Sequence, residues 1–235
     1  MHFGALMFFT EYSMTPADLA RAMEARGFES AWALDHSHIP ASRRTPYPGG
    51  GDLPKEYYNV MDPFVALTAA AIATSTLKVG TGVCLLNQRD PVQTAKLVGS
   101  IDQVSGGRFL FGVDIGWNAA EMENHSTTFA ACAQLVRDRI EAMTAIWTQP
   151  EAEYHGALVD FEPIIAWPKP VQKPHPPIIV GGGFPHAARR AVRYCDGWMP
   201  QPLEVAGAAN GFAVVSEFRE MVKTGGRDPA AIRSI

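Results

Sequence analysis

The sequence predicts an α/β protein built on a parallel sheet, and three features of the 235-residue chain predict it. Short continuous apolar runs recur along the chain, and each leads into a segment whose apolar residues have helical spacing. These runs lack the alternation of apolar and polar residues that is typical of a strand with one solvent-exposed face. They therefore indicate strands covered on both sides by helices. Hydrophobic residues make up 47% of the chain, enough for a large core. Both a closed (β/α)8 barrel and an open doubly wound sheet agree with this pattern.

The strand and helix units follow one another from the N-terminus. The first is an apolar run at 2–9 followed by a helix at 17–28, with Pro16 near its start and Gly27 near its end. The later strands are expected at 30–34, 77–86, 108–116, 176–183 and 196–201. The later helices are expected at 61–76, 90–104, 119–147, 185–195 and 211–226. Six such units are two strands short of a (β/α)8 barrel.

The whole range 1–235 is expected to form one domain, in which two segments interrupt the alternation of strands and helices. Segment 36–61, after the second strand, is rich in Pro, Gly and aromatic residues, which is typical of a loop over a functional site. Segment 151–176 is expected to form an extended hairpin and a Pro-rich connection. This segment either has a function or only packs against the rim of the barrel. The last residues, after Gly-Gly-Arg-Asp-Pro, begin a further apolar strand, so we expect a barrel incomplete at strands seven and eight.

Composition limits the classes of partner. A formal charge of −4, with no run of Lys or Arg, argues against nucleic acid and anionic membranes and favours a small organic molecule. The three cysteines are far apart in sequence, which predicts reduced thiols and neither a disulfide framework nor a zinc ribbon. Without a recognisable signal peptide or membrane span, the protein is expected in the cytoplasm.

Several motifs stand at the carboxyl ends of expected strands, where parallel α/β proteins assemble their sites. Gly181, Gly182 and Gly183 precede a helix, so their backbone could approach a phosphate, or they merely close a tight turn. They form neither the dinucleotide fingerprint nor a P-loop. Gly82 interrupts a buried run and marks either a ligand's approach or close packing.

The stretch "ALDHSHIP" places Asp35, His36 and His38 within four positions. Such a trio suits zinc binding, proton transfer or a solvated turn equally well. Glu121 and His125 lie four apart on one expected helical face and could bind a metal, although a surface contact is the commoner reason for this spacing. The later strand ends offer mainly Gly, Trp and Met, so no metal site is expected.

Longer stretches of the chain carry a family resemblance. They include "GFESAWALDHSHIP", "DPFVALTAAAIATSTLKVGTGVCLL", "DPVQTAKLVGSIDQVSGGRFLFGV" and "GWNAAEM", and they extend over almost the whole chain. The sequence thereby resembles the luciferase-like monooxygenase superfamily, specifically its branch of coenzyme F420-dependent oxidoreductases. The resemblance implies a (β/α)8 barrel with a flavin or deazaflavin ring in its mouth and the cofactor phosphate near the loop after strand five.

The resemblance also implies roles for individual residues. Asp35 and His36 match an Asp-His pair near the reactive ring, with Glu11 as an assisting group. Gly82 and Val83 match a strand-three site that often has a non-proline cis peptide supporting the ring. Trp117 and Asn118 match the rim of strand four, and the expected phosphate loop corresponds to Gly181, Gly182 and Gly183. Asp114 departs from the pattern, because a glycine is common there.

The function that this resemblance implies is hydride transfer between coenzyme F420 and an unknown organic substrate, with the cofactor performing the chemistry. An FMN-dependent monooxygenase is the alternative within the same family. A non-catalytic flavin-binding protein and a metal-dependent barrel hydrolase are alternatives of other classes. The resemblance further implies a homodimer.

Overall fold

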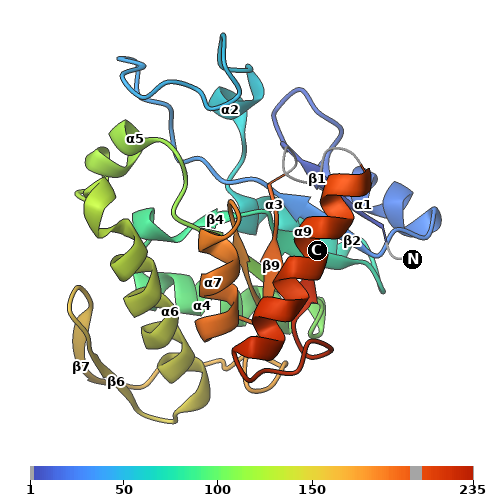
Figure 1. Ribbon diagram of the computed structural model, residues 1–235. Coiled ribbons are helices and arrows are strands. Elements are labelled where there is room, and N and C mark those ends of the chain that lie inside the picture. The colour runs from blue at the N-terminus through green and yellow to red at the C-terminus, as the bar shows by residue number, and fades with distance from the viewer. Residues whose placement is uncertain (1–2, 202–207, 235) are drawn as a thin grey trace.

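The computed structural model describes residues 3–201 and 208–234 and has the expected α/β architecture (Figure 1). The main sheet runs in the order β1-β2-β3-β5-β8-β9-β10, with every neighbouring pair parallel, and β4 adds to β5. Its strands are β1 (Gly4–Met7), β2 (Ser30–Ala33), β3 (Lys78–Thr81), β4 (Cys84–Leu85), β5 (Phe109–Asp114), β8 (Ile178–Gly181), β9 (Gly197–Met199) and β10 (Arg233–Ser234). The strands of this sheet lie side by side in the order in which they occur along the chain, as in a (β/α) barrel. In a doubly wound sheet the strand order reverses part-way, so that alternative is wrong.

The helices surround this sheet in chain order. The order of packing is α1 on α3, α3 on α4, α4 on α6, and then α7 on α9. Their bounds are α1 (Pro16–Ala25), α2 (Glu56–Asn59), α3 (Pro63–Ile72), α4 (Pro91–Ser105), α5 (Ala119–Asn124), α6 (Cys132–Thr148), α7 (His186–Tyr194) and α9 (Ala208–Thr224). Two short 3-10 turns lie at Leu86–Gln88 and Phe129–Ala131. The arrangement places a helix between successive strands, as the repeating units predict.

Three of the helices begin in the same way. Thr15, Asp62 and Asp90 each stand before a proline and accept a hydrogen bond from a backbone N–H of the first turn of α1, α3 and α4. A side-chain oxygen at this position satisfies a donor that the helix leaves unpaired, and proline is tolerated at the next position because its missing N–H is not needed there. The start points of these helices were therefore readable from sequence.

Apolar packing covers both faces of the sheet. On the inner face, Trp32, Leu110 and Ile179 from β2, β5 and β8 form one cluster with Met199 of β9. On the outer face, a larger cluster joins the strands to the helices, and it includes Val79, Phe111 and Val180 from the same sheet. Burial on both faces explains why the strands read as continuous apolar runs.

The expected helix over 119–147 is wrong, because residues 125–131 separate α5 from α6. Ser126 has a positive φ of 57°, which the helical conformation does not allow. Glu123 O accepts a hydrogen bond from Ser126 N, and Met122 O accepts from both His125 N and Thr127 N, so the chain closes tight turns here. The interruption leaves α5 as a separate short helix above the sheet.

The two irregular segments lie at opposite ends of the molecule (Figure 1). Segment 36–61 carries α2 and lies with α5 at the carboxyl end of the sheet. Segment 151–176 contains the antiparallel hairpin of β6 (Ala152–His155) and β7 (Asp160–Ile164), as the sequence predicts. Of the helices within the described ranges, none is long and apolar enough to cross a membrane.

Candidate functional site

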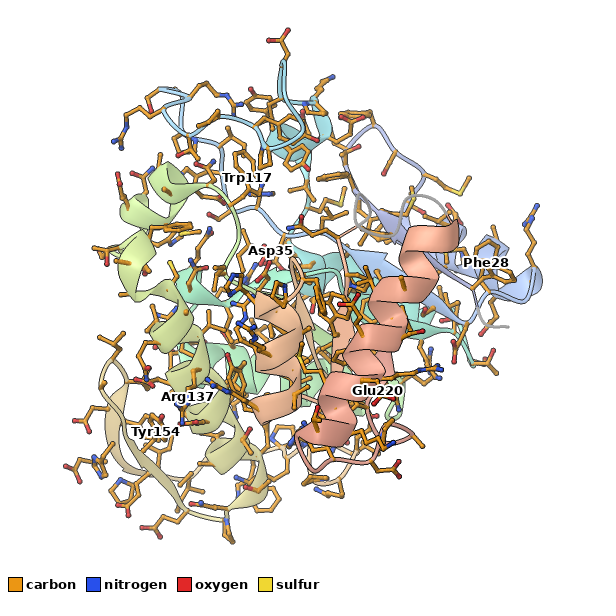
Figure 2. All side chains as sticks on the ribbon, in the orientation of Figure 1. Phe28, Asp35, Trp117, Arg137, Tyr154 and Glu220 are labelled. Carbon is orange, nitrogen blue, oxygen red and sulfur yellow. The ribbon has the colours of Figure 1, made fainter. Side chains whose placement is uncertain are left out.

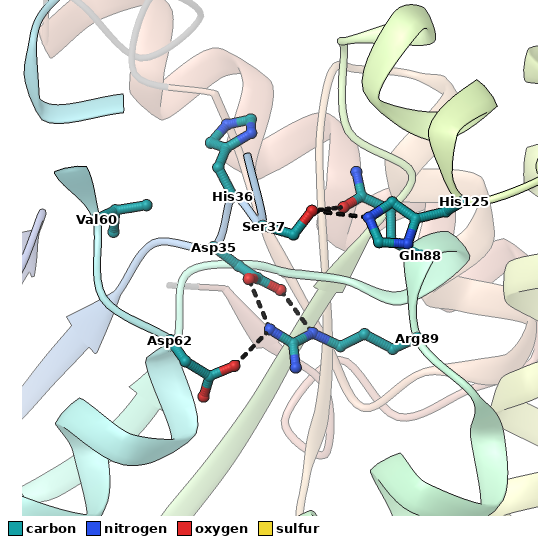
Figure 3. Close-up of a pocket in the computed structure, with 8 residues that line it drawn as sticks. All are labelled: Asp35, His36, Ser37, Val60, Asp62, Gln88, Arg89 and His125. Carbon is teal, nitrogen blue, oxygen red and sulfur yellow. Dashed lines mark hydrogen bonds and ion pairs between the residues drawn. The ribbon is translucent and has the colours of Figure 1, made fainter. Parts of the chain in front are cut away.

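A polar pocket of about 350 Å³ opens at the carboxyl ends of β2 and β4 (Figure 3). The pocket is lined by Asp35, His36, Ser37, Val60, Asp62, Gln88, Arg89 and His125. These side chains come from four separate stretches of sequence, namely the end of β2, the loop before α3, the segment after β4 and the segment after α5. Figure 2 shows Asp35 and Trp117 toward the same end of the molecule, with Tyr154 of the β6–β7 hairpin toward the other.

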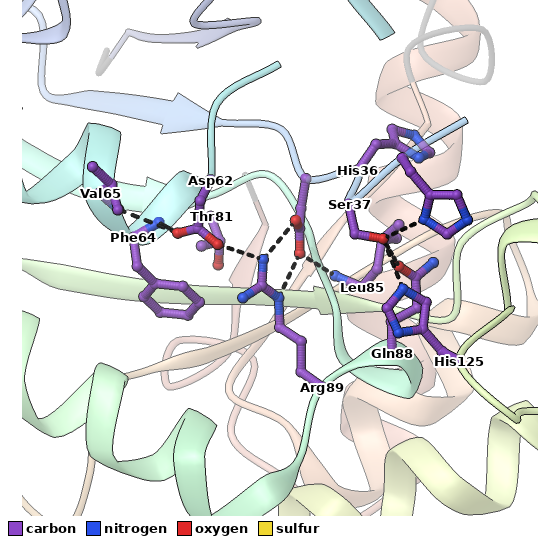
Figure 4. A network of polar contacts seen from close by, with 12 residues as sticks. His36, Ser37, Asp62, Phe64, Val65, Thr81, Leu85, Gln88, Arg89 and His125 are labelled. Carbon is purple, nitrogen blue, oxygen red and sulfur yellow. Dashed lines mark hydrogen bonds and ion pairs between the residues drawn. The ribbon is translucent and has the colours of Figure 1, made fainter. Parts of the chain in front are cut away.

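Asp35 is part of an ion-pair network at the base of this pocket. Arg89 donates to both oxygens of Asp35, with Nε at 2.9 Å and Nη2 at 2.7 Å, and Leu85 N donates to the same carboxylate at 3.1 Å. The Arg89 Nη2 also donates to Asp62, which in turn accepts hydrogen bonds at the start of α3 (Figure 4). Burial opposes the charge of Arg89, but hydrogen bonding with Asp35 raises its pKa above the ordinary value. The fork geometry ties the end of β2 to β4 and α3.

His36, the next residue, belongs to a different network. Its Nδ1 lies 2.8 Å from Glu121 Oε2, and the side chains of the two residues are 5% and 0% exposed. The second oxygen of Glu121 accepts a hydrogen bond from Ser37 N at 3.1 Å. Glu121 thus binds two consecutive residues of the segment after β2, and the His36 ring is fixed at the pocket wall.

Aromatic rings surround the His36 side chain. The centroid of the Tyr57 ring lies 5.2 Å from that of His36, and the centroid of Trp117 lies 5.9 Å away. Tyr47 contacts both Tyr57 and Trp117 edge-on. Burial raises the pKa of the Tyr57 hydroxyl, and its hydrogen bond with Tyr47 adds to this effect, so Tyr57 is neutral near pH 7. Tyr47 and Tyr57 of loop 36–61 therefore shape the wall around the histidine, whereas Tyr58 is 52% exposed.

The outer rim of the pocket is a cluster of polar side chains around Ser37. The Ser37 hydroxyl lies 2.7 Å from His125 Nε2 and 2.9 Å from His38 Nδ1, and it donates to Gln88 Oε1 at 3.2 Å (Figure 4). Partial burial and the nearby His38 lower the pKa of His125, which favours its neutral form. Within the described part of the chain, no three His, Cys, Asp or Glu side chains gather in a geometry suited to a metal ion.

A second group of predicted residues lies on the neighbouring strands. A Cβ at Gly181 would stand 2.8 Å from the Val83 side chain, so Val83 packs directly on the end of β8. Gly182 has φ +112°, a conformation that side-chain-bearing residues rarely adopt, and it lies beside Asp114 and Arg190. Arg190 Nη2 donates to Asp114 Oδ1 at 3.2 Å. Burial raises the pKa of Asp114 to about 6, although Arg190 opposes the shift.

The peptide bond between Gly82 and Val83 is cis, as the resemblance implies. A Cβ at Gly82 would stand 2.5 Å from Leu6 Cδ1 and 3.1 Å from the Cβ of Trp32. A side chain at Gly82 would therefore require Leu6 to move and would be tight against Trp32. Whether the same peptide also supports a cofactor ring stays a prediction.

Two predicted site residues have structural partners instead of pocket contacts. Asn118 caps α5, because its Oδ1 accepts a hydrogen bond from Glu121 N at 3.3 Å. Glu11 is exposed and accepts a hydrogen bond from Asn59 at 2.7 Å. Asn59 belongs to α2 in the loop over the pocket, so Glu11 contributes to the position of that loop. Their predicted roles toward a cofactor stay predictions.

Comparison with known proteins identifies the family. The family model of luciferase-like monooxygenases matches residues 12–235. The chain belongs to the luciferase-like monooxygenase family. An uncharacterised protein of Mycobacterium tuberculosis is 40% identical over 209 residues, which cover 87% of this chain and 74% of that protein. The matched region thus includes nearly all of the elements described above.

Relatives of known activity in this family use different cofactors. An FMNH2-dependent dimethylsulfone monooxygenase of Pseudomonas putida is 30% identical, over 83% of this chain and 54% of that protein. An F420-dependent hydroxymycolic acid dehydrogenase of M. tuberculosis is 26% identical, over 91% of this chain and 55% of that protein. The chain therefore spans about half the length of these two relatives.

Solved structures of the family share the fold. A monooxygenase from Streptomyces bottropensis superposes with a TM-score of 0.81 at 23% identity, over 100% of this chain and 70% of that chain. At this level of identity the likeness concerns the fold alone. It agrees with the parallel strand order of the luciferase-like chain.

Sequence reasoning missed two residues of this luciferase-like site. It gave no role to Arg89, which neutralises Asp35, and it considered Glu121 only as a partner of His125. Arg89 is 54 positions from Asp35, and Glu121 is 85 positions from His36. No local pattern predicts contacts at such separations.

Proposed function

We propose that this luciferase-like chain carries the cofactor site of an oxidoreductase that transfers a hydride between coenzyme F420 and a small organic substrate. The observation that carries the proposal is the buried His36 ring, held by Glu121 at the wall of a pocket and enclosed by Tyr57 and Trp117. A positioned histidine beside aromatic rings is suited to bind a flat heterocycle and to hold a proton near it. The 26% identity to an F420-dependent dehydrogenase supports the choice of cofactor.

The residues near Gly182 suit the phosphate of such a cofactor. Arg190 has a buried Nε without a hydrogen-bond partner among the described residues, and its guanidinium lies beside the glycine turn. In our proposal the backbone of Gly181, Gly182 and Gly183 and the Arg190 side chain hold the phosphate, since guanidinium and exposed backbone N–H groups both favour an anion. When bound, the deazaflavin ring would supply the hydride-transferring centre.

In this proposal the protein residues position and exclude water, and the cofactor reacts. His36 holds or accepts a proton at its pocket-facing nitrogen, while Tyr57 and Trp117 cover the ring from solvent. Asp35 keeps the end of β2 in place through Arg89 and is not available as an acid or base. The polar rim formed by Ser37, His38 and His125 is the proposed contact for a substrate with hydrogen-bonding groups.

A second candidate is an FMN-dependent monooxygenase, because the FMNH2-dependent relative is the more similar of the two in sequence, at 30% identity. Both cofactors present a similar ring and a phosphate, so the glycine turn and His36 would serve either one. The substrates of the two reactions differ, but the pocket residues do not distinguish them.

Anaerobic titration of the protein with F420 and with FMN, followed by fluorescence, tests the proposal. We expect saturable F420 binding at least about tenfold tighter than FMN binding, a difference of about 1.4 kcal/mol. The reverse preference would favour the monooxygenase, and absence of F420 binding would contradict the proposal. Binding without turnover with any electron donor would leave only a flavin-binding protein.

A matched pair of variants tests the phosphate contact. Arg190→Gln should weaken cofactor binding about tenfold, because a charge-assisted hydrogen bond to the phosphate is lost. Arg193→Gln, on the same helix but exposed, should leave binding unchanged. Equal effects of the two substitutions would remove Arg190 from the proposed phosphate site.

A further inference from the structure

We propose that Glu121 is a positioning residue that determines which ring nitrogen of His36 carries the proton and which one faces the pocket. In this arrangement Nδ1 keeps its hydrogen toward Glu121, and Nε2 is the nitrogen that gains and loses a proton on the pocket side. The inference rests on the proposed function only in giving this proton a role in the reaction. The assignment of the nitrogens itself depends on contacts within the protein.

The contacts of the Glu121 carboxylate specify the direction of each hydrogen bond. An ionised carboxylate only accepts hydrogen bonds. Its Oε1 accepts from Ser37 N at 3.1 Å, and its Oε2 lies 2.8 Å from His36 Nδ1, which therefore has to donate. Both side chains are nearly inaccessible to solvent, with exposed fractions of 0% and 5%, so water does not replace either bond. A carboxylate in this position selects the Nδ1–H form of a neutral imidazole.

The surrounding structure holds Glu121 in place. Asn118 caps the start of α5 by accepting a hydrogen bond from Glu121 N, and Met122 N donates to Asn118 O. Thr45 Oγ1 accepts a hydrogen bond from Ala120 N at 3.1 Å, which connects the same turn to loop 36–61. The carboxylate therefore approaches residues 36 and 37 from a helix turn fixed at two further points.

The other nitrogen of His36 is the one that remains available to a ligand. Among the described residues, Nε2 makes no hydrogen bond, and His36 is one of the residues that line the pocket. The carboxylate of Asp35 is fully engaged by Arg89 and Leu85 N, and the rim histidines contact the Ser37 hydroxyl. Glu121 is thus the acidic group that hydrogen-bonds the ring, and it does so through Nδ1 alone.

Glu121→Gln turns this arrangement into a direct test. The amide has one accepting oxygen and one donating NH2 group. Ser37 N is a fixed donor, so the oxygen has to stay toward Ser37 and the NH2 group then faces His36. Because the NH2 group only donates, Nδ1 of His36 has to accept, and the ring proton moves to Nε2. The substitution keeps the size of the side chain but inverts the tautomer.

Nitrogen NMR of the cofactor-free protein measures the outcome. In uniformly ¹⁵N-labelled protein, long-range ¹H–¹⁵N spectra distinguish protonated from unprotonated ring nitrogens, and His36→Gln identifies the signals of this ring. As pH is raised, the nitrogen that loses its proton should be Nε2 in the wild type and Nδ1 in Glu121→Gln. Glu123→Gln is the matched control, because this exposed neighbour pairs with Arg44 and should leave the wild-type pattern unchanged.

Two results would overturn the inference. One is a wild-type ring that loses its proton from Nδ1, and the other is a Glu121→Gln ring that keeps the wild-type pattern in a protein with unchanged thermal unfolding. If Glu121→Gln does not fold, the wild-type spectrum alone still decides the assignment. The measurement needs no cofactor, so failure of F420 binding would refute the proposed function and leave this inference standing.

Discussion

Asp35 and His36 are adjacent in sequence, yet their side chains belong to separate hydrogen-bond networks (Figure 3). The Asp35 carboxylate receives three hydrogen bonds, two from Arg89 and one from Leu85 N. The His36 ring has one nitrogen bound to Glu121, and the other makes no hydrogen bond among the described residues. A side chain whose hydrogen-bonding capacity is already used stabilises the structure, whereas a side chain with one free group is available for a ligand.

This difference follows from the geometry of a strand end. Successive residues leaving β2 point in different directions, so one reaches the neighbouring β4 and α3 while the next reaches α5 above the sheet. The anchored residue Asp35 holds the backbone that positions His36. Substitutions at the two positions should therefore have different consequences, because only the second removes a group that is available to a ligand.

The largest effect is expected for Asp35→Ala. It leaves the largely buried Arg89 with the half-exposed Asp62 as its acidic partner, and removal of one member of a buried pair costs about 4 kcal/mol. The free energy of unfolding in urea should fall by about this amount. A loss below about 1 kcal/mol would show that Asp35 does not anchor the strand.

The second effect concerns activity. His36→Ala should lower turnover about 100-fold, a typical loss when a positioned acid or base is removed. It should also lower the free energy of unfolding, because the buried Glu121 carboxylate loses its ring partner. His38→Ala should change turnover only a few-fold, because His38 lies on the rim beside Ser37 and Asn124. Comparison of kcat for both variants on one cofactor and substrate checks this, and equal losses would contradict it.

A third test contrasts Asp35 with Asp114, another aspartate that pairs with an arginine. Asp114 has one hydrogen bond from Arg190 at 3.2 Å, and burial raises its pKa to about 6. Its pKa in the unfolded chain is about 3.9, so the folded state binds the proton more tightly and loses stability as pH rises from about 4 to about 6. This loss is about 2 kcal/mol between pH 4 and pH 6, and the full shift corresponds to about 3 kcal/mol.

Asp114→Asn removes that titration. Relative to the wild type, the unfolding free energy of the variant should rise by about 2 kcal/mol between pH 4 and pH 7. Urea unfolding of both proteins at several pH values measures the difference. A constant difference across this range would mean that burial does not disfavour the charge of Asp114.

The smallest effect is expected for Asp62→Ala. Asp62 caps α3 and accepts one hydrogen bond from Arg89, but its side chain is 42% exposed. Loss of the cap costs about 1 kcal/mol, and a half-exposed ion pair adds little. The unfolding free energy should therefore fall much less than for Asp35→Ala. Equal losses for the two variants would show that the ion pair of Arg89 with Asp62 stabilises the fold as much as its ion pair with Asp35 does.

Much of the fold was predictable because it depends on local signals. The caps at Thr15, Asp62 and Asp90 and the prolines after them marked three helix starts. The continuous apolar runs marked strands buried on both faces. The break between α5 and α6 was missed, because a positive φ at Ser126 has no sequence signature as clear as a glycine.

The site was predictable only in part. His36 and Trp117 do come together with Tyr47 and Tyr57 of loop 36–61, because all of them follow strands at the same edge of the sheet. Glu11 and Asn118 lie near this edge but contact other groups. The sequence identified the correct edge of the sheet and did not identify the partner of each side chain there.

By itself the sequence determined the order of strands and helices, their approximate limits and the edge at which polar residues collect, since periodicity, caps and chain order are local properties. Tertiary structure alone decided that Asp35 pairs with Arg89 and that His36 pairs with Glu121. Those contacts join residues 54 and 85 positions apart, and their distances depend on the curvature and packing of the complete sheet. For this reason "ALDHSHIP" reads as one polar cluster in the sequence and separates into an anchor and a pocket residue in the fold.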